Sequence, residues 1–269
     1  MAYKSSKISQ GAPKKGSSIS PILGFPLNSS SLDEVLKNLT TRLEAKMKTF
    51  VVTPNPEFLV FASDHPWFGK ILRESDLAVP DGIGLIWASR FLGKKPRLNH
   101  RVSGTDLMQE LCREAAIRGW SVYFLGGLPG VADSAAHKLK ELYPRLKFFV
   151  DEGSKLNLDQ ETGRLEPEKE MAQMVENINR QAPDLLFVAF GMGKQEKFIT
   201  DNWRNLNIGL AMGIGGAFDY ISGKVPRAPL FIRKIGFEWL FRLLRQPWRL
   251  KRQFNLLRFV FLVFKEKFS

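Results

Sequence analysis

The order of apolar and polar residues along the chain predicts alternating helices and strands. Residues 31–34 have the Ser-x-x-Glu pattern of a helix capping box, and the leucines and valine that follow recur at helical spacing. Residues 49–52, 120–125 and 184–190 are short apolar or β-branched runs, typical of buried strands. Because strands and helices alternate up to about residue 219, we expect an α/β fold, Rossmann-like, with a mainly parallel sheet and helices on both faces.

Turns rich in glycine or polar residues follow five of the predicted strands. They lie at 53–57, around Asp81, and at 126–130, 191–195 and 213–219. The carboxyl ends of parallel strands share one edge of a sheet, so these turns should meet there and form a ligand crevice. Glycine lets the backbone approach a ligand closely, and helix N-termini offer N–H groups to phosphate.

Asp81 is the most distinctive residue of these turns. It lies between Pro80, which fixes the backbone, and Gly82, which frees it, at the end of an apolar strand. An aspartate at this point can be an ordinary helix N-cap. Its place among four other unusual turns favours a functional carboxylate.

The C-terminal segment shows a second pattern. A helix over about 229–245 should end before Pro247, and a second helix should run to the end of the chain. Residues 259–264 form the longest uncharged apolar run there, which is far too short to span a bilayer. The apolar residues that recur at steps of four and three, within roughly 80° of arc, are Leu250, Phe254, Leu257, Phe261, Phe264 and Phe268.

Charge decides between two interpretations of this stripe. From Arg233 to the end, the chain has ten Lys and Arg residues and two glutamates, so this segment carries +8 of the net charge of +13. One interpretation is an amphipathic helix packed on its own core. The other, which the charge favours, is a helix lying in the interface of an anionic membrane.

Composition narrows the functional classes. A chain of 269 residues with 44% hydrophobic residues can form one large domain or a domain with an appendage. The single cysteine, Cys112, excludes an internal disulfide, and no Cys/His cluster has the spacing of metal ligands. His65, His100 and His137 have no nearby Ser or Cys that would form a triad, so we interpret them as structural or surface residues.

The first twenty residues have four lysines among Ser, Gly and Pro, and they lack the apolar core of a signal peptide. We therefore expect three parts. Residues 1–20 form a disordered basic tail, residues 21–228 an α/β catalytic domain, and residues 229–269 an amphipathic helical appendage.

Single features of the sequence suggest two functional classes, an oxidoreductase and a nucleic-acid-binding module. Gly126-Gly127-x-x-Gly130 after a strand, with Asp151 ending the next strand, loosely matches the dinucleotide fingerprint of an NAD-type oxidoreductase, but the glycine spacing is wrong. The basic C-terminal segment alternatively indicates a nucleic-acid-binding module. Its Phe clustering argues against this, because a helix in a DNA groove needs polar residues towards the bases.

Together the motifs resemble the WecG/TagA/CpsF glycosyltransferase family over about residues 20–255. The basic segment Phe237-Glu-Trp-Leu-Phe-Arg-Leu-Leu-Arg-Gln-Pro-Trp-Arg also matches. The six matching motifs are Thr53-Pro-Asn-Pro-Glu, Val79-Pro-Asp-Gly-Ile-Gly, Arg101-Val-Ser-Gly-Thr-Asp, Phe124-Leu-Gly-Gly, Phe190-Gly-Met-Gly-Lys-Gln-Glu and Gly213-Ile-Gly-Gly-Ala-Phe-Asp.

The resemblance implies transfer of N-acetylmannosamine or a related sugar from a UDP donor. The acceptor would be a polyprenyl-diphosphate-linked saccharide in the synthesis of teichoic acid, exopolysaccharide or other cell-wall polymers. It implies inversion at the anomeric carbon without a metal ion or other cofactor, which agrees with the missing D-x-D motif. The protein would be cytoplasmic and peripheral on the inner face of the plasma membrane. It would bind no nucleic acid, and it would form homo-oligomers when off the membrane.

The resemblance also assigns roles to residues. Asp81 would be the general base, Thr53, Asn55 and Gln195 would position the sugars, and Arg101 would stabilise the leaving diphosphate. Residues implied to bind the UDP-sugar are Gly126, Gly127, Gly193, Lys194, Gly215, Gly216 and Asp219. Residues implied to bind the acceptor diphosphate and the membrane are Arg242, Arg245, Arg249 and Arg252.

One stretch departs from the family pattern. An aromatic Gly-Tyr element often follows the strand that ends near residue 150, whereas this chain has Asp151-Glu-Gly-Ser-Lys155. The contacts to the donor base should differ at this point.

Overall fold

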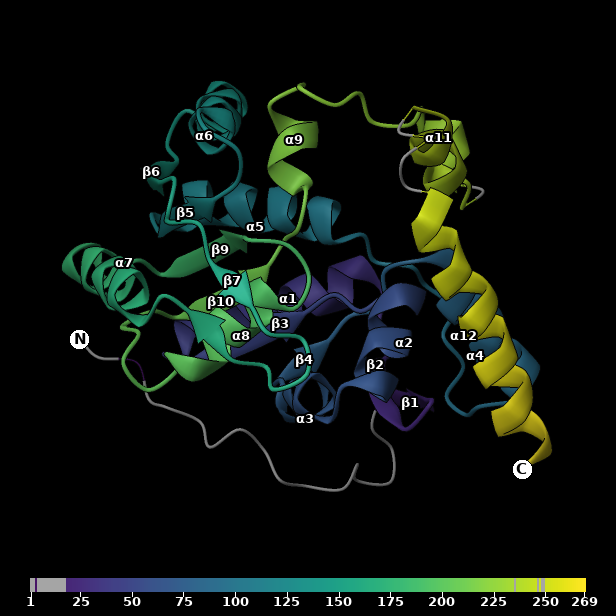
Figure 1. Ribbon diagram of the computed structural model, residues 1–269. Helices are drawn as coiled ribbons and strands as arrows, with labels where there is room; N and C mark the ends of the chain where they lie inside the picture. The colour runs from purple at the N-terminus through teal and green to yellow at the C-terminus, as the bar shows by residue number, and fades with distance from the viewer. Residues whose placement is uncertain (1–2, 4–17, 235, 246, 248–249) are drawn as a thin grey trace.

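The computed structural model describes residues 3, 18–234, 236–245, 247 and 250–269, without the side chains of 234, 242 and 251–253. At its centre lies a six-stranded sheet with the strand order β4-β3-β10-β9-β5-β6, in which every pair is parallel (Figure 1). The predicted α/β fold is confirmed. The strands are β3 (Thr49–Val52), β4 (Leu77–Ala78), β5 (Ser121–Gly126), β6 (Lys147–Asp151), β9 (Leu185–Ala189) and β10 (Leu210–Gly213).

Side chains of each central strand alternate between two cores. In β5, Val122 and Phe124 face one core and Tyr123 and Leu125 the other, as the period of two requires. Both faces are thereby covered, which explains why the strands read as continuous apolar runs. The first core includes residues of α1 (Leu32–Glu44), α5 (Gly104–Arg118), α6 (Val131–Leu142) and α9 (Ala217–Ile221). The second includes residues of α2 (Pro56–Asp64), α3 (Pro66–Glu74), α4 (Ile83–Leu92), α7 (Glu168–Gln181) and α8 (Lys194–Asp201).

Two small antiparallel hairpins lie beside the sheet. One joins β1 (Ile19–Ile22) to β2 (Phe25–Asn28). Tyr3 also contacts the folded part of the chain, because the Tyr3 hydroxyl donates a hydrogen bond to the Asp184 carboxylate. The second hairpin, of β7 (Asn157–Leu158) and β8 (Leu165–Glu166), lies within the polar segment 153–166, where the sequence pattern predicts no strand.

The appendage departs from the expected single helix over 229–245. It contains α10 (Leu230–Lys234) and α11 (Glu238–Arg245), with Gly236 between them at φ +82. The Phe237 N–H donates to Ile232 O at 3.0 Å and the Gly236 N–H to Arg233 O at 3.1 Å, which ends the first helix as a left-handed glycine cap does. α11 begins two residues after this glycine.

The last helix, α12 (Leu250–Phe268), lies along α2 and α4 (Figure 1). Its buried side chains are Phe259 and Val263, which belong to the second core. The predicted stripe lies on the opposite side and is exposed, with Phe254, Leu257 and Phe261 each 66–69% accessible. The helix therefore packs on the protein's own core, as one of the two interpretations expected, but through Phe259 and Val263 rather than through this stripe.

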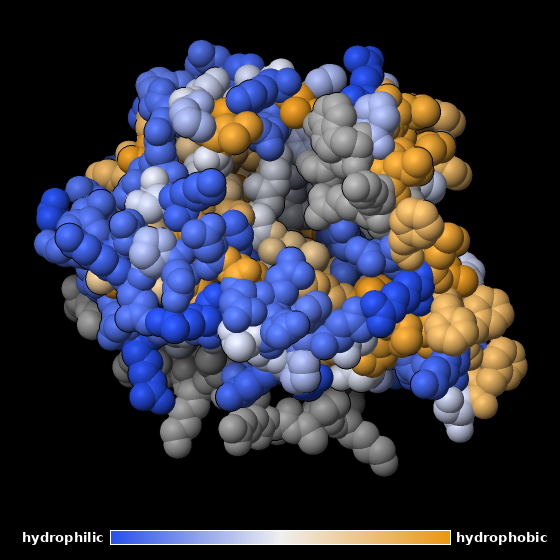
Figure 2. Space-filling model, viewed as in Figure 1, coloured by the Kyte–Doolittle hydropathy of each residue, from blue (hydrophilic) through white to orange (hydrophobic). Residues whose placement is uncertain are grey.

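Apolar surface gathers along the side formed by the appendage, where orange residues extend over α11 and α12 (Figure 2). Within the described residues, no helix is both long and apolar enough to cross a bilayer.

Candidate active site

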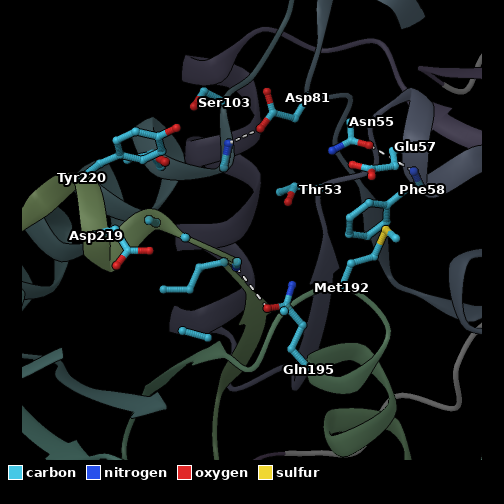
Figure 3. A pocket seen from close by; sticks show the side chains of 18 of the residues that line it. Thr53, Asn55, Glu57, Phe58, Asp81, Ser103, Met192, Gln195, Asp219 and Tyr220 are labelled. Atoms are coloured by element: carbon cyan, nitrogen blue, oxygen red, sulfur yellow. Dashed lines mark hydrogen bonds between the residues drawn. The ribbon is translucent and has the colours of Figure 1, made fainter. Parts of the chain in front are cut away.

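A cavity of about 1290 Å³ opens at the carboxyl edge of the sheet. Turns after β3, β4, β5, β9 and β10 line it, as the sequence predicted. The appendage supplies a further wall through Phe237, Glu238 and Trp239 of its first part and Leu256 and Val260 of α12. Figure 3 shows Asp81, Thr53 and Asn55 around one open space, with Asp219 and Tyr220 across from them.

Asp81 lies between the N-termini of two helices but does not cap the one that follows it. The N-cap of α4 is Gly82, and no side chain caps this end. One Asp81 oxygen instead accepts the N–H of Gly104, the first residue of α5, at 3.2 Å (Figure 3). The N-cap interpretation of Asp81 for its own helix is therefore wrong, because this carboxylate accepts an N–H at the start of α5 and none at the start of α4.

Burial raises the pKa of Asp81 to about 6. Arg101 and the Gly104 N–H oppose this rise in pKa, whereas the negative charges of Glu238 and Asp106 add to it. A carboxylate with such a pKa is ionised at pH 7 and is a stronger base than an exposed aspartate.

Thr53 and Asn55 follow β3 and lie beside Asp81. The Asn55 side-chain oxygen accepts the Phe58 N–H at 3.0 Å and so caps α2, which orients its amide group towards the cavity. A Cβ on Gly104 would lie 3.1 Å from Thr53 Oγ1, so the glycine permits the close approach of α5 to this turn. The sequence singled out neither Gly104 nor the neighbouring Ser103, although both lie in the Arg-Val-Ser-Gly motif.

Both the oxygen and the nitrogen of the Gln195 side-chain amide make hydrogen bonds. Its oxygen accepts the Gly215 N–H at 3.0 Å, and its nitrogen donates to Glu196 Oε1 at 2.7 Å. The other oxygen of Glu196 accepts the Gly193 N–H at 2.8 Å. Burial raises the pKa of Glu196 to about 7. The buried Gln195 amide thus joins the turn after β9 to the turn after β10, and the buried Glu196 holds that amide in place.

Cations surround the same cavity. Arg101 lines it and makes an ion pair with Glu238 at 3.0 Å. Lys194 also lines it, and its Nζ donates to Leu156 O at 2.5 Å. Asp219 lies with Gly215 and Gly216 at the start of α9, across the cavity. No group of three or more His, Cys, Asp or Glu within the described part of the chain has the arrangement of a metal site.

Two of the predicted glycines do not line the cavity but shape its turns. Gly126 has φ +86 and Gly193 has φ +87, conformations that other residues rarely adopt. Gly127 does line it. The N–H of Gly130 donates to Glu152 at 2.8 Å, so this carboxylate takes the place that a dinucleotide phosphate would need at the start of α6. This contact argues against the oxidoreductase alternative.

The four predicted acceptor-binding arginines are located only in part. Arg249 lies outside the described residues, as do the side chains of Arg242 and Arg252. Arg245 is exposed, stacks its guanidinium over Phe241 at 5.4 Å, and does not line the cavity. Sequence reasoning missed Glu238 as a cavity residue, although it lies in the Phe237-Glu-Trp motif that carried the resemblance.

Comparisons with known proteins agree with this geometry. The sequence profile described as "Glycosyl transferase WecG/TagA/CpsF family" matches residues 20–269. Two relatives, from Staphylococcus aureus strains MW2 and NCTC 8325, are each called N-acetylglucosaminyldiphosphoundecaprenol N-acetyl-beta-D-mannosaminyltransferase. Each is 29% identical over 248 residues, which cover 91% of this chain and 92% of the relative. The chain therefore belongs to the WecG/TagA/CpsF family and is a glycosyltransferase.

Proposed function

We propose that this protein transfers N-acetylmannosamine, or a closely related sugar, from UDP to N-acetylglucosamine on a polyprenyl diphosphate. The observation that carries the proposal is Asp81, a carboxylate of raised pKa that faces a large cavity at the carboxyl edge of the sheet. The names of the similar staphylococcal proteins supply the sugar and the acceptor.

The cavity has a polar end that suits a UDP-sugar. Gly127, Gly215, Gly216 and Asp219 line this end, and backbone N–H groups and the Asp219 carboxylate can bind the phosphates and the hydroxyls or base of the nucleotide. Lys194 and Arg101 can balance the charge of the diphosphate without a metal ion. The Glu152 turn replaces the aromatic element of relatives, so donor-base contacts come from different groups here.

The chemistry is a single inverting displacement. The acceptor hydroxyl oxygen attacks the anomeric carbon of the donor sugar, and its proton passes to the Asp81 carboxylate. The bond between the anomeric carbon and the UDP oxygen breaks, and UDP leaves with the electron pair. Thr53, Asn55 and Gln195 orient the sugars, and Arg101 stabilises the charge that develops on the diphosphate.

The exposed stripe of the appendage suits a lipid-linked acceptor. The stripe of α12 and the basic charge of the segment favour binding in the interface of an anionic membrane, on the inner face, where nucleotide sugars are available. Away from the membrane, the same apolar side would drive self-association into homo-oligomers.

The test is Asp81→Asn with UDP-N-acetylmannosamine and a short-chain lipid acceptor, with the product measured by mass spectrometry. We expect turnover to fall by roughly 10²–10⁴-fold while UDP binding, measured by calorimetry, is kept. Asp219→Asn is the matched control at the nucleotide end, where donor KM should rise more than turnover falls. Near-normal turnover of Asp81→Asn would remove Asp81 as the base.

A further inference from the structure

Glu238, the first residue of α11, is held by two arginines from the catalytic domain. Arg101 Nη2 lies 3.0 Å from Glu238 Oε2, and Arg227 Nε lies 3.2 Å from Glu238 Oε1. The three side chains are only 16–18% exposed, so these charges are partly removed from water. Both oxygens of one carboxylate therefore join the appendage to the catalytic domain.

One of the two arginines that hold Glu238, Arg227, has further partners in the catalytic domain. Arg227 donates to Asp106 Oδ1 at 2.5 Å and to Ser103 Oγ at 3.1 Å, and Arg233 lies 3.6 Å from the same Asp106 oxygen. This network ties the start of α5 to the appendage. Because Gly104 in the same turn donates to Asp81, the network is one hydrogen bond away from the catalytic carboxylate.

Glu238 also lies in the wall of the cavity, together with Arg101. The groups that act on Asp81 are the positive charge of Arg101, the negative charges of Glu238 and Asp106, and the Gly104 N–H. Arg101 lowers the pKa of Asp81 and Glu238 raises it, so the Arg101–Glu238 pair limits how strongly the guanidinium acts on the base.

We propose that Glu238 is a positioning residue for Arg101 and, through it, for Asp81. The Glu238 carboxylate fixes the guanidinium of Arg101 and balances its charge, so that Asp81 remains a strong base. This inference rests on the proposed function, because it assumes that Asp81 is the base.

The test compares Glu238→Gln with Glu266→Gln in full-length protein. Gln has the shape of Glu without its charge. Glu266 is the matched control because it also joins the appendage to the catalytic domain, through Lys94 at 2.6 Å and the Leu23 N–H at 2.8 Å, but it does not line the cavity. Circular dichroism and a thermal melt check that both variants fold.

The readout is the acidic limb of kcat/KM against pH. In the wild type, half-maximal activity should lie near pH 6, where Asp81 gains its proton. In Glu238→Gln, loss of the negative charge lowers the pKa of the base, so the limb should move about 0.5–1 unit to lower pH. The maximum kcat/KM should fall about tenfold or more, because Arg101 is no longer held in place. Glu266→Gln should keep the limb of the wild type.

The inference would be overturned if the acidic limb of kcat/KM lay at the same pH in Glu238→Gln as in the wild type. It would also be overturned if Glu238→Gln and Glu266→Gln shifted this limb equally. Asp81→Asn separates this failure from failure of the proposed function. If Asp81→Asn remains inactive while the Glu238→Gln limb stays in place, only the role of Glu238 is wrong. If Asp81→Asn is active, the proposed base is wrong as well.

Discussion

The buried carboxylate of Asp81 lowers the stability of the folded protein at neutral pH. In the unfolded chain its pKa returns to the ordinary value near 3.8, whereas burial in the folded protein raises it to about 6. Between these pH values the folded protein binds more protons than the unfolded chain, so the free energy of unfolding falls as pH rises from about 4 to about 6. The loss in the free energy of unfolding is nearly complete once the pH is well above 6.

Asp81→Asn should therefore be more stable than the wild type at pH 8. Asparagine keeps an oxygen for the Gly104 N–H and carries no charge to bury, so we expect a gain of about 1–3 kcal/mol in the free energy of unfolding. Denaturant melts of both proteins at pH 8 and pH 4 measure it, and the difference should shrink towards pH 4. A variant that is less stable than the wild type at pH 8 would show that burial of this carboxylate does not oppose folding.

A glycine stands at each end of β10, Gly209 just before the strand and Gly213 as its last residue, and both lie in crowded surroundings. Their neighbours differ. A Cβ on Gly213, at the carboxyl end, would lie 2.6 Å from Gln195 Nε2 and 2.8 Å from Glu196 Oε1. A Cβ on Gly209, just before the strand, would lie 2.7 Å from Asp184 O. Both positions are closed to larger residues by packing, but only Gly213 touches the side chains that join the cavity turns.

Gly213→Ala should lower turnover by about 10–100-fold, because the new methyl group displaces the Gln195 amide from Gly215. Gly209→Ala is the matched control. Each substitution should cost about 1–3 kcal/mol in stability through overpacking, but Gly209→Ala should keep the turnover of the folded fraction. Melts and single-turnover assays of both variants make the comparison. Equal loss of turnover would mean that general crowding of the strand, not Gln195, limits the reaction.

The elements that sequence patterns predicted are those with strong local periodicity. The apolar runs of β5 and β9 and the capping box of α1 need no tertiary information. The β7–β8 hairpin was missed because its polar sequence has no period. It is held instead by distant groups: Trp67 donates to Gln160 O at 2.8 Å, and its ring leaves no room for a Cβ on Gly163.

The candidate site was predictable to the extent that it lies in turns after strands. Thr53, Asn55, Asp81 and Gln195 all line the cavity, because parallel strands bring their carboxyl ends together. Glu238 was not identified as a cavity residue, because its contacts are with Arg227 and Arg101, which lie 11 and 137 residues away in sequence. The break at Gly236 was also missed, since a single glycine within a basic apolar segment does not reveal its backbone conformation.

The whole molecule presents its apolar side chains unevenly. Leu257 and Phe261 of α12 are 68% and 66% exposed, and α12 lies on the side of the molecule where apolar residues gather (Figure 2). Ile117 and Leu142 are exposed to a similar degree, 62% and 63%, but lie on α5 and α6, away from the appendage. Deleting α12 would also expose the core around Phe259 and Val263, so point variants test membrane binding better than truncation does.

Leu257→Glu/Phe261→Glu should greatly weaken binding to vesicles that contain anionic lipid, because it places two carboxylates in the surface that would enter the interface. Ile117→Glu/Leu142→Glu adds the same charge elsewhere and should bind like the wild type. Vesicle co-sedimentation measures both, with circular dichroism as the folding control. High salt should weaken wild-type binding. Equal sedimentation of the two double variants would contradict a membrane role for this stripe.

One side of α12 lines the cavity with Leu256 and Val260, and another carries the exposed stripe. A helix is about 10 Å across, so on the proposed function the cavity would open within that distance of the lipid headgroups. An acceptor anchored by its isoprenoid chain would then reach the enzyme by lateral diffusion in two dimensions. The rate would follow the number of acceptor molecules per area of bilayer rather than per volume of solution. Plain lipid added to the vesicles would slow the reaction, although the amounts of enzyme, donor and acceptor in the tube stay the same.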